Sequence, residues 1–355
     1  MARRKNLGLI IFSLLLVGVQ LLTVMVDRSY YLTQLTMALY NCLLISGLCL
    51  VMGYAGQISL GHAGFFAIGG YTSATLTTIN LSESLAGGNP LVASLAKMGL
   101  LQGGTSLFGE ELLYVHPWLA FAVAILITAL VAFVIGIPVL KLKGHYLAMA
   151  TLGFGIIIYR IVLAVEIFGE ADGISDVPGF TLLPGLVVNG EIDNRVTNYY
   201  IAAAILLCGV WLLQNLIDSR VGRALRAIHG AEDAANAMGV NTARYKLNTF
   251  VISAIFAAVA GVLLTHYNGG IAPADAGVMK SVRYVAIVAI GGMASLWGAL
   301  IMGGLLTFLS LRGLFGSYDD AVFGVILIVI MLFAPEGILR LGLWTRLKKL
   351  AWGRA

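Results

Sequence analysis

The chain has little charge, few cysteines and few prolines for its 355 residues. Charged side chains make up 11% of the sequence and hydrophobic residues 59%, with a mean hydropathy of +0.94. This balance excludes an ordinary soluble domain. The three cysteines, Cys42, Cys49 and Cys208, are odd in number and lie in apolar runs, which argues against a disulfide scaffold or a CxxC metal site. The composition predicts a polytopic membrane protein.

The motifs of ATP-binding and metal-dependent enzymes are also absent. No GxxxxGK[ST] phosphate loop occurs, because the chain contains no Gly-Lys pair, and HExxH is missing. The five histidines are scattered without metal-ligand spacing. We therefore expect no enzyme activity and no cofactor bound by this chain. The net charge of +5 indicates an excess of basic residues in cytoplasmic loops, and we expect no nucleic-acid partner.

Long apolar runs predict the membrane spans, each of which needs about 20 residues. They lie at 7–26, 32–52, 58–79, 117–140, 145–167, 199–217, 247–267 and 321–339. A further apolar segment, 284–310, is interrupted. We expect an all-α helical bundle of about 8–10 spans that forms one transmembrane domain over residues 1–355.

The distribution of charge predicts the topology. If Arg3–Lys5 lie in the cytoplasm and the sides alternate, the basic loops 141–143 and 218–246 fall inside, whereas the acidic loop 170–176 falls outside. The basic tail 340–355 should also lie inside. Both chain ends are then cytoplasmic.

This topology requires an even number of crossings from segment 284–310, so the segment is either a re-entrant hairpin or two crossings. It breaks at Gly291 and Gly292, shortly before Ser295. Non-helical backbone at membrane depth is tolerated where protein or a water-filled cavity satisfies it. The break is therefore a candidate pore-lining feature, and the alternative is a tight turn between two short spans.

The stretch "GYAGQISLGHAGFFAIGGYTSA", residues 53–74, combines small and polar residues. Small residues recur at every third position, which predicts close approach of a neighbouring backbone; they are Gly61, Gly64, Ala67 and Gly70. Gln57, Ser59 and His62 add hydrogen-bonding groups that could line a solute path, although tight packing and a locally satisfied histidine are the alternatives. A short echo, "GGMASLWGALIMGG" from residue 291, suggests paired interrupted segments of the kind found at transporter binding regions.

The most polar part of the chain is the island "RVGRALRAIHGAEDAANAMGVNTARYK", residues 220–246. It carries Arg223 and Arg226 and a short helical pattern from Gly230 to Gly239, with Glu232 and Asp233 in the first turn, where they complement the helix dipole. A small apolar face is predicted at spacing i, i+3, i+4, i+7; its members are Ala231, Ala234, Ala235 and Met238. Such a face on a cytoplasmic helix predicts a partner protein, whereas a solvated basic loop explains only the arginines.

These two stretches, with "KLKGHYLAMATLGFG" between them, resemble the LivM-type permease subunits of ABC importers for branched-chain amino acids, in order from about residue 30 to 340. The resemblance implies the bacterial inner membrane, surrounding lipid, a related second permease, two cytoplasmic ATPases that hydrolyse ATP, and a periplasmic substrate-binding protein. Similar permeases carry urea or short amides, which is the alternative for the substrate.

The resemblance also implies that the island contacts the ATPase. The signature of ABC importer permeases reads Glu-Ala-Ala, three residues, Gly, and here Asp233, Ala234, Ala235 and Gly239 keep the spacing with Asp in place of Glu. The Ile-x-Leu-Pro part that follows in the signature is absent. We expect the coupling contact in loop 218–246.

Arg160 departs from the resembled family, because positions 156–158 before it are isoleucine where an acid is usual. An arginine inside a span is costly and marks a functional site by default. Its partner could be another helix, a backbone carbonyl, water or a passing carboxylate. Two other classes remain open: a self-sufficient secondary transporter, for which Glu166 is the one span-end carboxylate, and an integral-membrane enzyme, for which no cluster of catalytic residues is visible.

Overall fold

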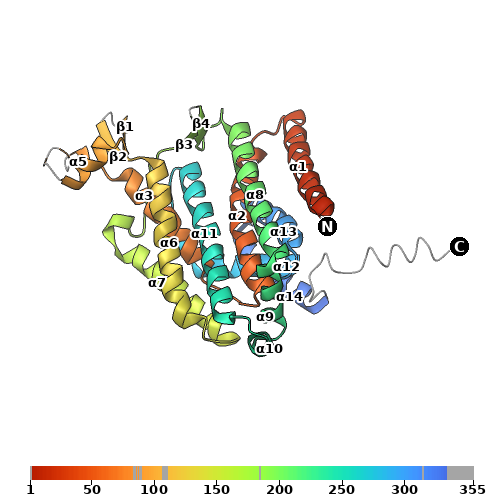
Figure 1. The fold of residues 1–355 in the computed structure, drawn as a ribbon. Helices are drawn as coiled ribbons and strands as arrows, with labels where there is room; N and C mark the ends of the chain where they lie inside the picture. Colours follow the sequence, from red (N-terminus) through yellow and green to blue (C-terminus); the bar gives the residue numbers. More distant parts are fainter. Residues whose placement is uncertain are drawn as a thin grey trace.

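The computed structural model describes residues 2–82, 85, 87, 90–105, 111–183, 185–313 and 316–333, which form a helical bundle (Figure 1). Within these residues, six helices are long and apolar enough to cross a bilayer. They are α1 (Ala2–Met25), α2 (Tyr31–Cys49, extended by the π-helix η1, Leu50–Tyr54), α6 (Pro117–Val139), α7 (His145–Ala164), α8 (Arg195–Asp218) and α11 (Thr242–Asn268). The predicted all-α polytopic bundle is confirmed.

The other apolar segments form shorter helices. These are α3 (His62–Thr78), α12 (Val278–Gly291), α13 (Leu296–Leu311) and α14 (Asp319–Phe333). The expected span 58–79 begins late, because residues 55–61 are not helical. The last part of the expected span 321–339, from residue 334, and the basic tail 340–355 lie outside the described residues.

The connecting segments gather at two opposite ends of the bundle (Figure 1). One end, called the hairpin end below, holds α5 (Pro90–Lys97) and two antiparallel ribbons. In these, β1 (Leu101–Thr105) pairs with β2 (Glu111–Val115), and β3 (Phe180–Leu183) pairs with β4 (Leu186–Val188). The other end, called the α10 end, holds α9 (Arg220–Gly230) and α10 (Glu232–Ala237). The basic island and the acidic loop near 170–176 therefore lie at opposite ends, as the charge pattern predicts.

The core forms where α2 and α11 run through the middle of the bundle, packed against α3, α6 and α8. Helix α6 turns a row of small residues inward at every fourth position, which lets neighbouring backbones approach; the row is Ala120, Ala124, Thr128, Ala132 and Gly136. Its outer side is apolar, with Leu126, Leu130 and Phe133 exposed. This is the chemistry expected of a lipid-facing surface.

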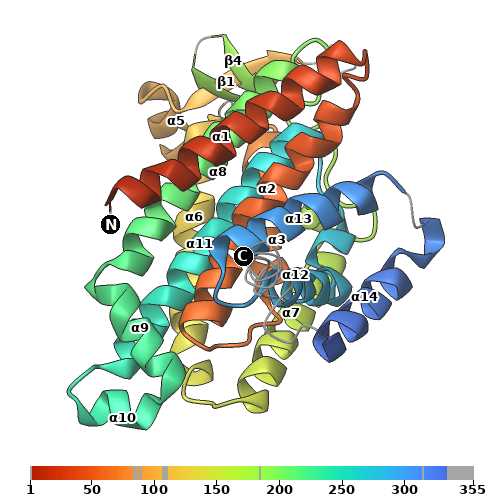
Figure 2. The same cartoon turned by 90° about the vertical axis from the view of Figure 1, so that its right-hand side faces the viewer.

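Helices α12 and α13 form a hairpin beside α2 (Figure 2). The turn between them begins at Gly292, whose φ of +96° is a conformation that favours glycine. The chain approaches α12 from the segment in which Ile271 bridges to Ile174. Helix α13 finishes beside the first turn of α2, where Arg312 lies over the ring of Tyr31. The predicted even number of crossings for segment 284–310 stays a prediction.

Candidate coupling and translocation sites

Helix α9 leaves the bundle through a tight turn at the end of α8. The hydroxyl of Ser219 caps α9 by accepting a hydrogen bond from the Val221 amide at 3.1 Å. Leu225 and Ile228 are buried on one side of α9, whereas Arg223 and Arg226 are exposed on the other. The arginines predicted for the coupling site are therefore free to meet a partner surface.

Helix α10 is fixed to two spans by Glu232. The Nζ atom of Lys246, in the second turn of α11, donates to the two carboxylate oxygens of Glu232 at 2.9 and 3.1 Å. The same ammonium donates to the carbonyl of Leu140, the C-cap of α6, at 3.3 Å. Lys246 is buried, so its charge depends on these oxygens. The sequence placed Lys246 only in the basic island and Glu232 in the first turn of the predicted coupling helix, and it did not pair the two.

Asp233 makes a second, looser attachment. It accepts a hydrogen bond at 3.0 Å from Lys143 in the loop between α6 and α7. The hydrogen bond and the charge of Asp233 raise the pKa of Lys143. Both side chains are mostly exposed, so this contact orients α10 more than it stabilises the fold. It also places the basic loop 141–143 at the α10 end, beside the island.

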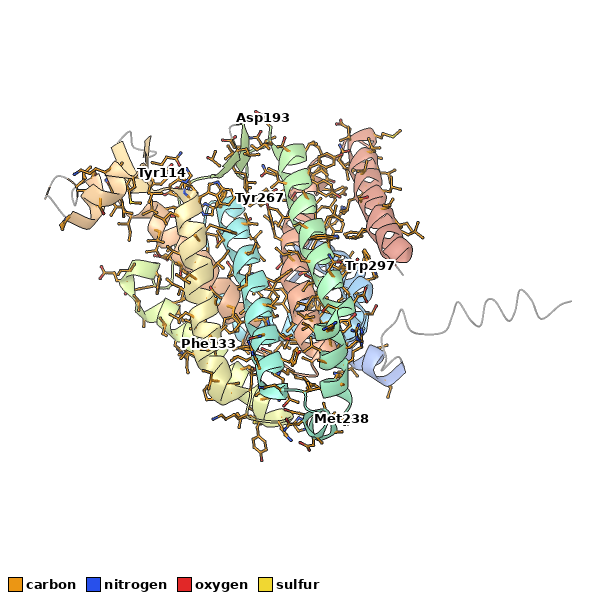
Figure 3. The ribbon with its side chains drawn as sticks, in the orientation of Figure 1. Tyr114, Phe133, Asp193, Met238, Tyr267 and Trp297 are labelled. Carbon is orange, nitrogen blue, oxygen red and sulfur yellow. The ribbon has the colours of Figure 1, made fainter. Side chains whose placement is uncertain are left out.

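The predicted apolar face of the island is only partly correct. Helix α10 spans six residues, Glu232–Ala237, so Ala231 is its extended N-cap rather than part of the helix. Ala235 is 6% exposed and packs inward, whereas Ala231 and Ala234 are exposed. Met238 is 85% exposed and lies at the tip of the α10 end (Figure 3). The available surface therefore consists of Ala231, Ala234 and Met238, without Ala235.

A hollow of about 510 Å³ opens beside this surface. It is lined by Ala224, Gly239, Val240, Asn241, Arg244, Tyr245 and Asn248, and so lies between α9 and the start of α11. Gly239 follows α10 with a φ of +83°, in agreement with the predicted helix stop. The hollow, the exposed Met238 and the arginines of α9 together make the α10 end a concave polar surface with one apolar anchor.

The first broken segment, residues 55–61, contains three of the predicted path residues, and a fourth, His62, begins the helix that follows. His62 is fully buried, and its two ring nitrogens bond Ser59 Oγ at 2.9 Å and Ser253 Oγ at 2.7 Å. Ser59 is also buried, and Gly61 is the N-cap of α3. Gln57 is 2% exposed, and neither polar atom of its amide has a hydrogen-bond partner in the part of the chain that the structure describes. His62 therefore joins the break to α11, while Gln57 has unused hydrogen-bonding capacity.

The second broken segment, residues 292–295, lies against η1, the π-helix that directly precedes the first broken segment. A Cβ atom on Gly53 would sit 1.5 Å from the carbonyl oxygen of Met293, and Cys49 Sγ lies 3.4 Å from the same oxygen. Gly291 approaches Gly298 closely, and Ser295 caps α13 by accepting from the Gly298 amide at 3.1 Å. The structure thus places the predicted break at Gly291 and Gly292 beside the end of the helix that leads into residues 55–61.

The row of small residues on α3 does produce close packing, but against two neighbours. A Cβ atom on Gly61 would lie 2.6 Å from the carbonyl oxygen of Thr151 on α7. On Gly70 it would lie 2.6 Å from Thr265 Oγ1 on α11. The row therefore changes partner along α3, because the helix is wedged between α7 and α11.

Arg160 lies apart from both breaks. It is four residues from the end of α7, and its side chain is exposed. Among the described residues it has no ion-pair or hydrogen-bond partner. Of the expected partners, another helix and a backbone carbonyl are therefore not seen, and the functional role of Arg160 stays a prediction.

The structure also reveals polar groups that the sequence reading missed. Asp275, in the 3-10 turn η3 (Pro273–Ala276), forms an ion pair with Lys280 in the first turn of α12. Tyr284, one turn later, donates a hydrogen bond to Asn41 Oδ1 at 2.7 Å within the bundle. The signal available was two basic residues, at 280 and 283, directly before an apolar run.

Comparison with known proteins agrees with this arrangement. Residues 30–332 match the family model described as branched-chain amino acid transport system / permease component. The chain is 30% identical to the high-affinity branched-chain amino acid transport system permease protein LivM of Escherichia coli K12, over 86% of this chain and 68% of that protein. It is 28% identical to LivH of the same organism, over 87% and 96%, and 29% identical to BraD of Pseudomonas aeruginosa, over 89% and 97%.

No solved structure matches the chain. The family model nevertheless covers nearly all of the described bundle, from the first turn of α2 to the last turn of α14. Both broken segments and the whole α10 end fall inside the matched range. The chain belongs to the permease component family of branched-chain amino acid transport systems.

Proposed function

We propose that the chain is a permease subunit of an ABC importer that carries leucine, isoleucine and valine across the inner membrane. The support is membership of the family, together with relatives whose names describe high-affinity branched-chain amino acid transport permeases. One observation carries the coupling role: α10 stands outside the bundle, presents Met238 and is bonded through Glu232 to Lys246 of α11, whose ammonium also bonds the end of α6. A helix attached in this way can pass a displacement on to the spans.

The energy comes from two separate ATPase subunits that dock on the α10 end. Met238 inserts as an apolar anchor, and Arg223 and Arg226 meet acidic groups at the rim of the contact, where charge steers association. The hollow beside Gly239 and Arg244 receives a projection of the ATPase. This chain binds no nucleotide itself.

The orientation follows from the charges at the two ends. The α10 end carries Lys143, Arg223 and Arg226 and faces the cytoplasm, as do both chain termini. The hairpin end carries the acidic loop 170–176 and faces outward, where it receives a substrate-binding protein. A second, related permease completes the solute path beside this chain.

Transport proceeds by alternating access. Closure of the ATPases moves α10 as a rigid unit, and Lys246 transmits the movement to α6 and α11. Helix α11 holds the first break through the Ser253–His62 hydrogen bond. The π-helix η1, which leads directly into the first break, lies against the turn of the α12–α13 hairpin, so a shift of α11 acts on both broken segments.

The test is uptake by the complete complex in proteoliposomes, assembled with the second permease, the ATPases and the binding protein. We expect ATP-dependent uptake of leucine that valine and isoleucine inhibit and urea does not. Uptake of urea or a short amide in place of leucine would support the alternative, a related permease with that substrate. Leucine uptake by this chain without ATPases would contradict the ABC assignment.

A further inference from the structure

The outer surface of the bundle differs in chemistry from side to side. On α1 from Leu7 onward, and on α6, every exposed side chain is apolar. The side formed by α7, η3 and α12, which contact one another, instead presents Arg160, Asp275 and Lys280. Charged groups within a membrane protein face a partner or a water-filled path rather than lipid. This side is therefore the one along which a polar solute can travel.

The Asp275–Lys280 ion pair lies well inside the bundle's depth. Ser281, next to Lys280, accepts a hydrogen bond at 3.0 Å from the amide of Ala63. Ala63 follows His62, which bonds Ser253 near the middle of α11. The first turn of α12 thus lies level with the first broken segment rather than in an outer loop.

The pair is partly open to this side, and each partner has a second contact. The side chains of Lys280 and Asp275 are 28% and 26% exposed. Lys280 Nζ lies 5.1 Å from the centre of the Phe66 ring, a cation–π contact. Asp275 Oδ2 accepts a hydrogen bond from the Ala272 amide at 3.2 Å. Either side chain can therefore stay in place when the ion pair opens.

Two buried hydroxyls border the same region without using their hydrogen-bonding capacity. Tyr71 and Thr265 are each 2% exposed, and their side-chain oxygens have no hydrogen-bond partner within the described ranges. Both lie near Gly70, where an added Cβ would sit 2.6 Å from Thr265 Oγ1 and 2.5 Å from Ile271. A buried hydroxyl without a partner is costly, so a polar solute passing here would gain from it.

We propose that Asp275 and Lys280 form a substrate subsite for the zwitterion of an α-amino acid. The ion pair opens, Lys280 binds the α-carboxylate, Asp275 binds the α-ammonium, and Phe66 and Ile271 contact the aliphatic side chain. Binding replaces the Asp275–Lys280 ion pair with two ion pairs between the protein and the substrate. No charge is then left unpaired, and binding stays weak enough for release. The inference rests on the proposed function, and it adds the recognition of both charges, which urea lacks.

A reversed ion pair separates this role from a structural one. The variants Lys280→Gln, Asp275→Asn and the double change Asp275→Lys/Lys280→Asp are measured for leucine uptake and for ATP hydrolysis in the complete complex. We expect all three to lose about tenfold in uptake, which corresponds to about 1.4 kcal/mol. The matched control Met279→Gln alters an exposed neighbour and keeps uptake within about twofold, a change below 0.5 kcal/mol. Recovery of wild-type uptake in the reversed pair would overturn the proposal.

A second measurement can be made without ATPases and leaves both charges of the ion pair in place. Ala272→Cys, at an exposed position whose amide donates to Asp275, is introduced with Cys208→Ser, since Cys42 and Cys49 are buried, and its reaction with a methanethiosulfonate reagent is followed in the purified permease pair. We expect leucine to slow the reaction and urea to leave it unchanged. Equal rates with and without leucine would overturn the subsite. Protection by leucine in a complex that shows no ATP-driven uptake would instead refute the ABC assignment and leave the subsite standing.

Discussion

Lys246 on α11 and Glu232 on α10 are joined by two hydrogen bonds, from Nζ to the two carboxylate oxygens at 2.9 and 3.1 Å. The same Nζ reaches the carbonyl at the end of α6. Because Lys246 is 5% exposed, water cannot replace Glu232 as its partner. Helix α10 is thus attached to the bundle by a buried charge, and this attachment has measurable consequences.

Neutralising Glu232 should cost far more stability than neutralising its neighbour. Glu232→Gln leaves the buried ammonium of Lys246 without its counter-charge, and we expect the free energy of unfolding to fall by about 3 kcal/mol. Asp233→Asn breaks only the exposed contact with Lys143 and should give no measurable change. Unfolding in detergent micelles measures both, and equal midpoints for the two variants would refute the buried-clamp interpretation.

The two adjacent alanines of α10 should respond oppositely to arginine. Ala234 is exposed, so Ala234→Arg should leave the folded permease intact while blocking close approach of an ATPase. Ala235 is buried, and Ala235→Arg should lower the free energy of unfolding by about 1–3 kcal/mol through overpacking, with more from the buried charge. The measurements are unfolding in detergent and co-purification of the ATPase. An intact, fully coupled Ala234→Arg variant would show that α10 is not the docking surface.

The contact between η1 and the second broken segment should not tolerate a single methyl group. In Gly53→Ala the added Cβ meets the Met293 carbonyl, and we expect a loss of about 1–3 kcal/mol in unfolding free energy. Gly153→Ala, on α7, is the matched control, because no atom lies within 4 Å of its added Cβ. That variant should be neutral or up to about 1 kcal/mol more stable, since alanine favours helix. A Gly53→Ala variant as stable as the control would refute the close approach.

Much of this architecture was predictable because hydropathy and small residues act locally. The six long spans, the helix stop at Gly239 and the break at Gly291–Gly292 all follow from residues close in sequence. The break before His62 was missed because residues 58–61 continue the apolar pattern of the helix that follows. Hydropathy measures affinity for lipid, and it does not report where a helix begins.

The tertiary pairings could not have been read from one sequence. Lys246 contacts the carbonyl of Leu140, which is 106 residues away, and His62 contacts Ser253, which is 191 residues away. The prediction of the island's apolar face was partly wrong for another reason, because the periodicity of α10 was extrapolated beyond a six-residue helix. Periodicity gives the direction of side chains only where the backbone remains helical.

The orientation in the membrane can be tested with single cysteines in a chain carrying Cys208→Ser. Asp193→Cys lies at the hairpin end and Asn236→Cys at the α10 end, and both positions are exposed (Figure 3 labels Asp193). An impermeant maleimide added outside intact cells should label position 193 and not 236. Detergent permeabilisation, the control, should label both. The reverse pattern would place the α10 end outside the cell.

The central claim is that ATP hydrolysis drives this permease through the α10 end, with Met238 as the apolar anchor. The most direct measurement is leucine transported per ATP hydrolysed by complexes carrying Met238→Asp or the matched control Met98→Asp. Met98 is 71% exposed but follows α5 at the hairpin end. We expect Met238→Asp to lower the ratio about tenfold or more, as loss of an interface anchor does, and Met98→Asp to keep it. A wild-type ratio in the Met238→Asp complex would contradict the account.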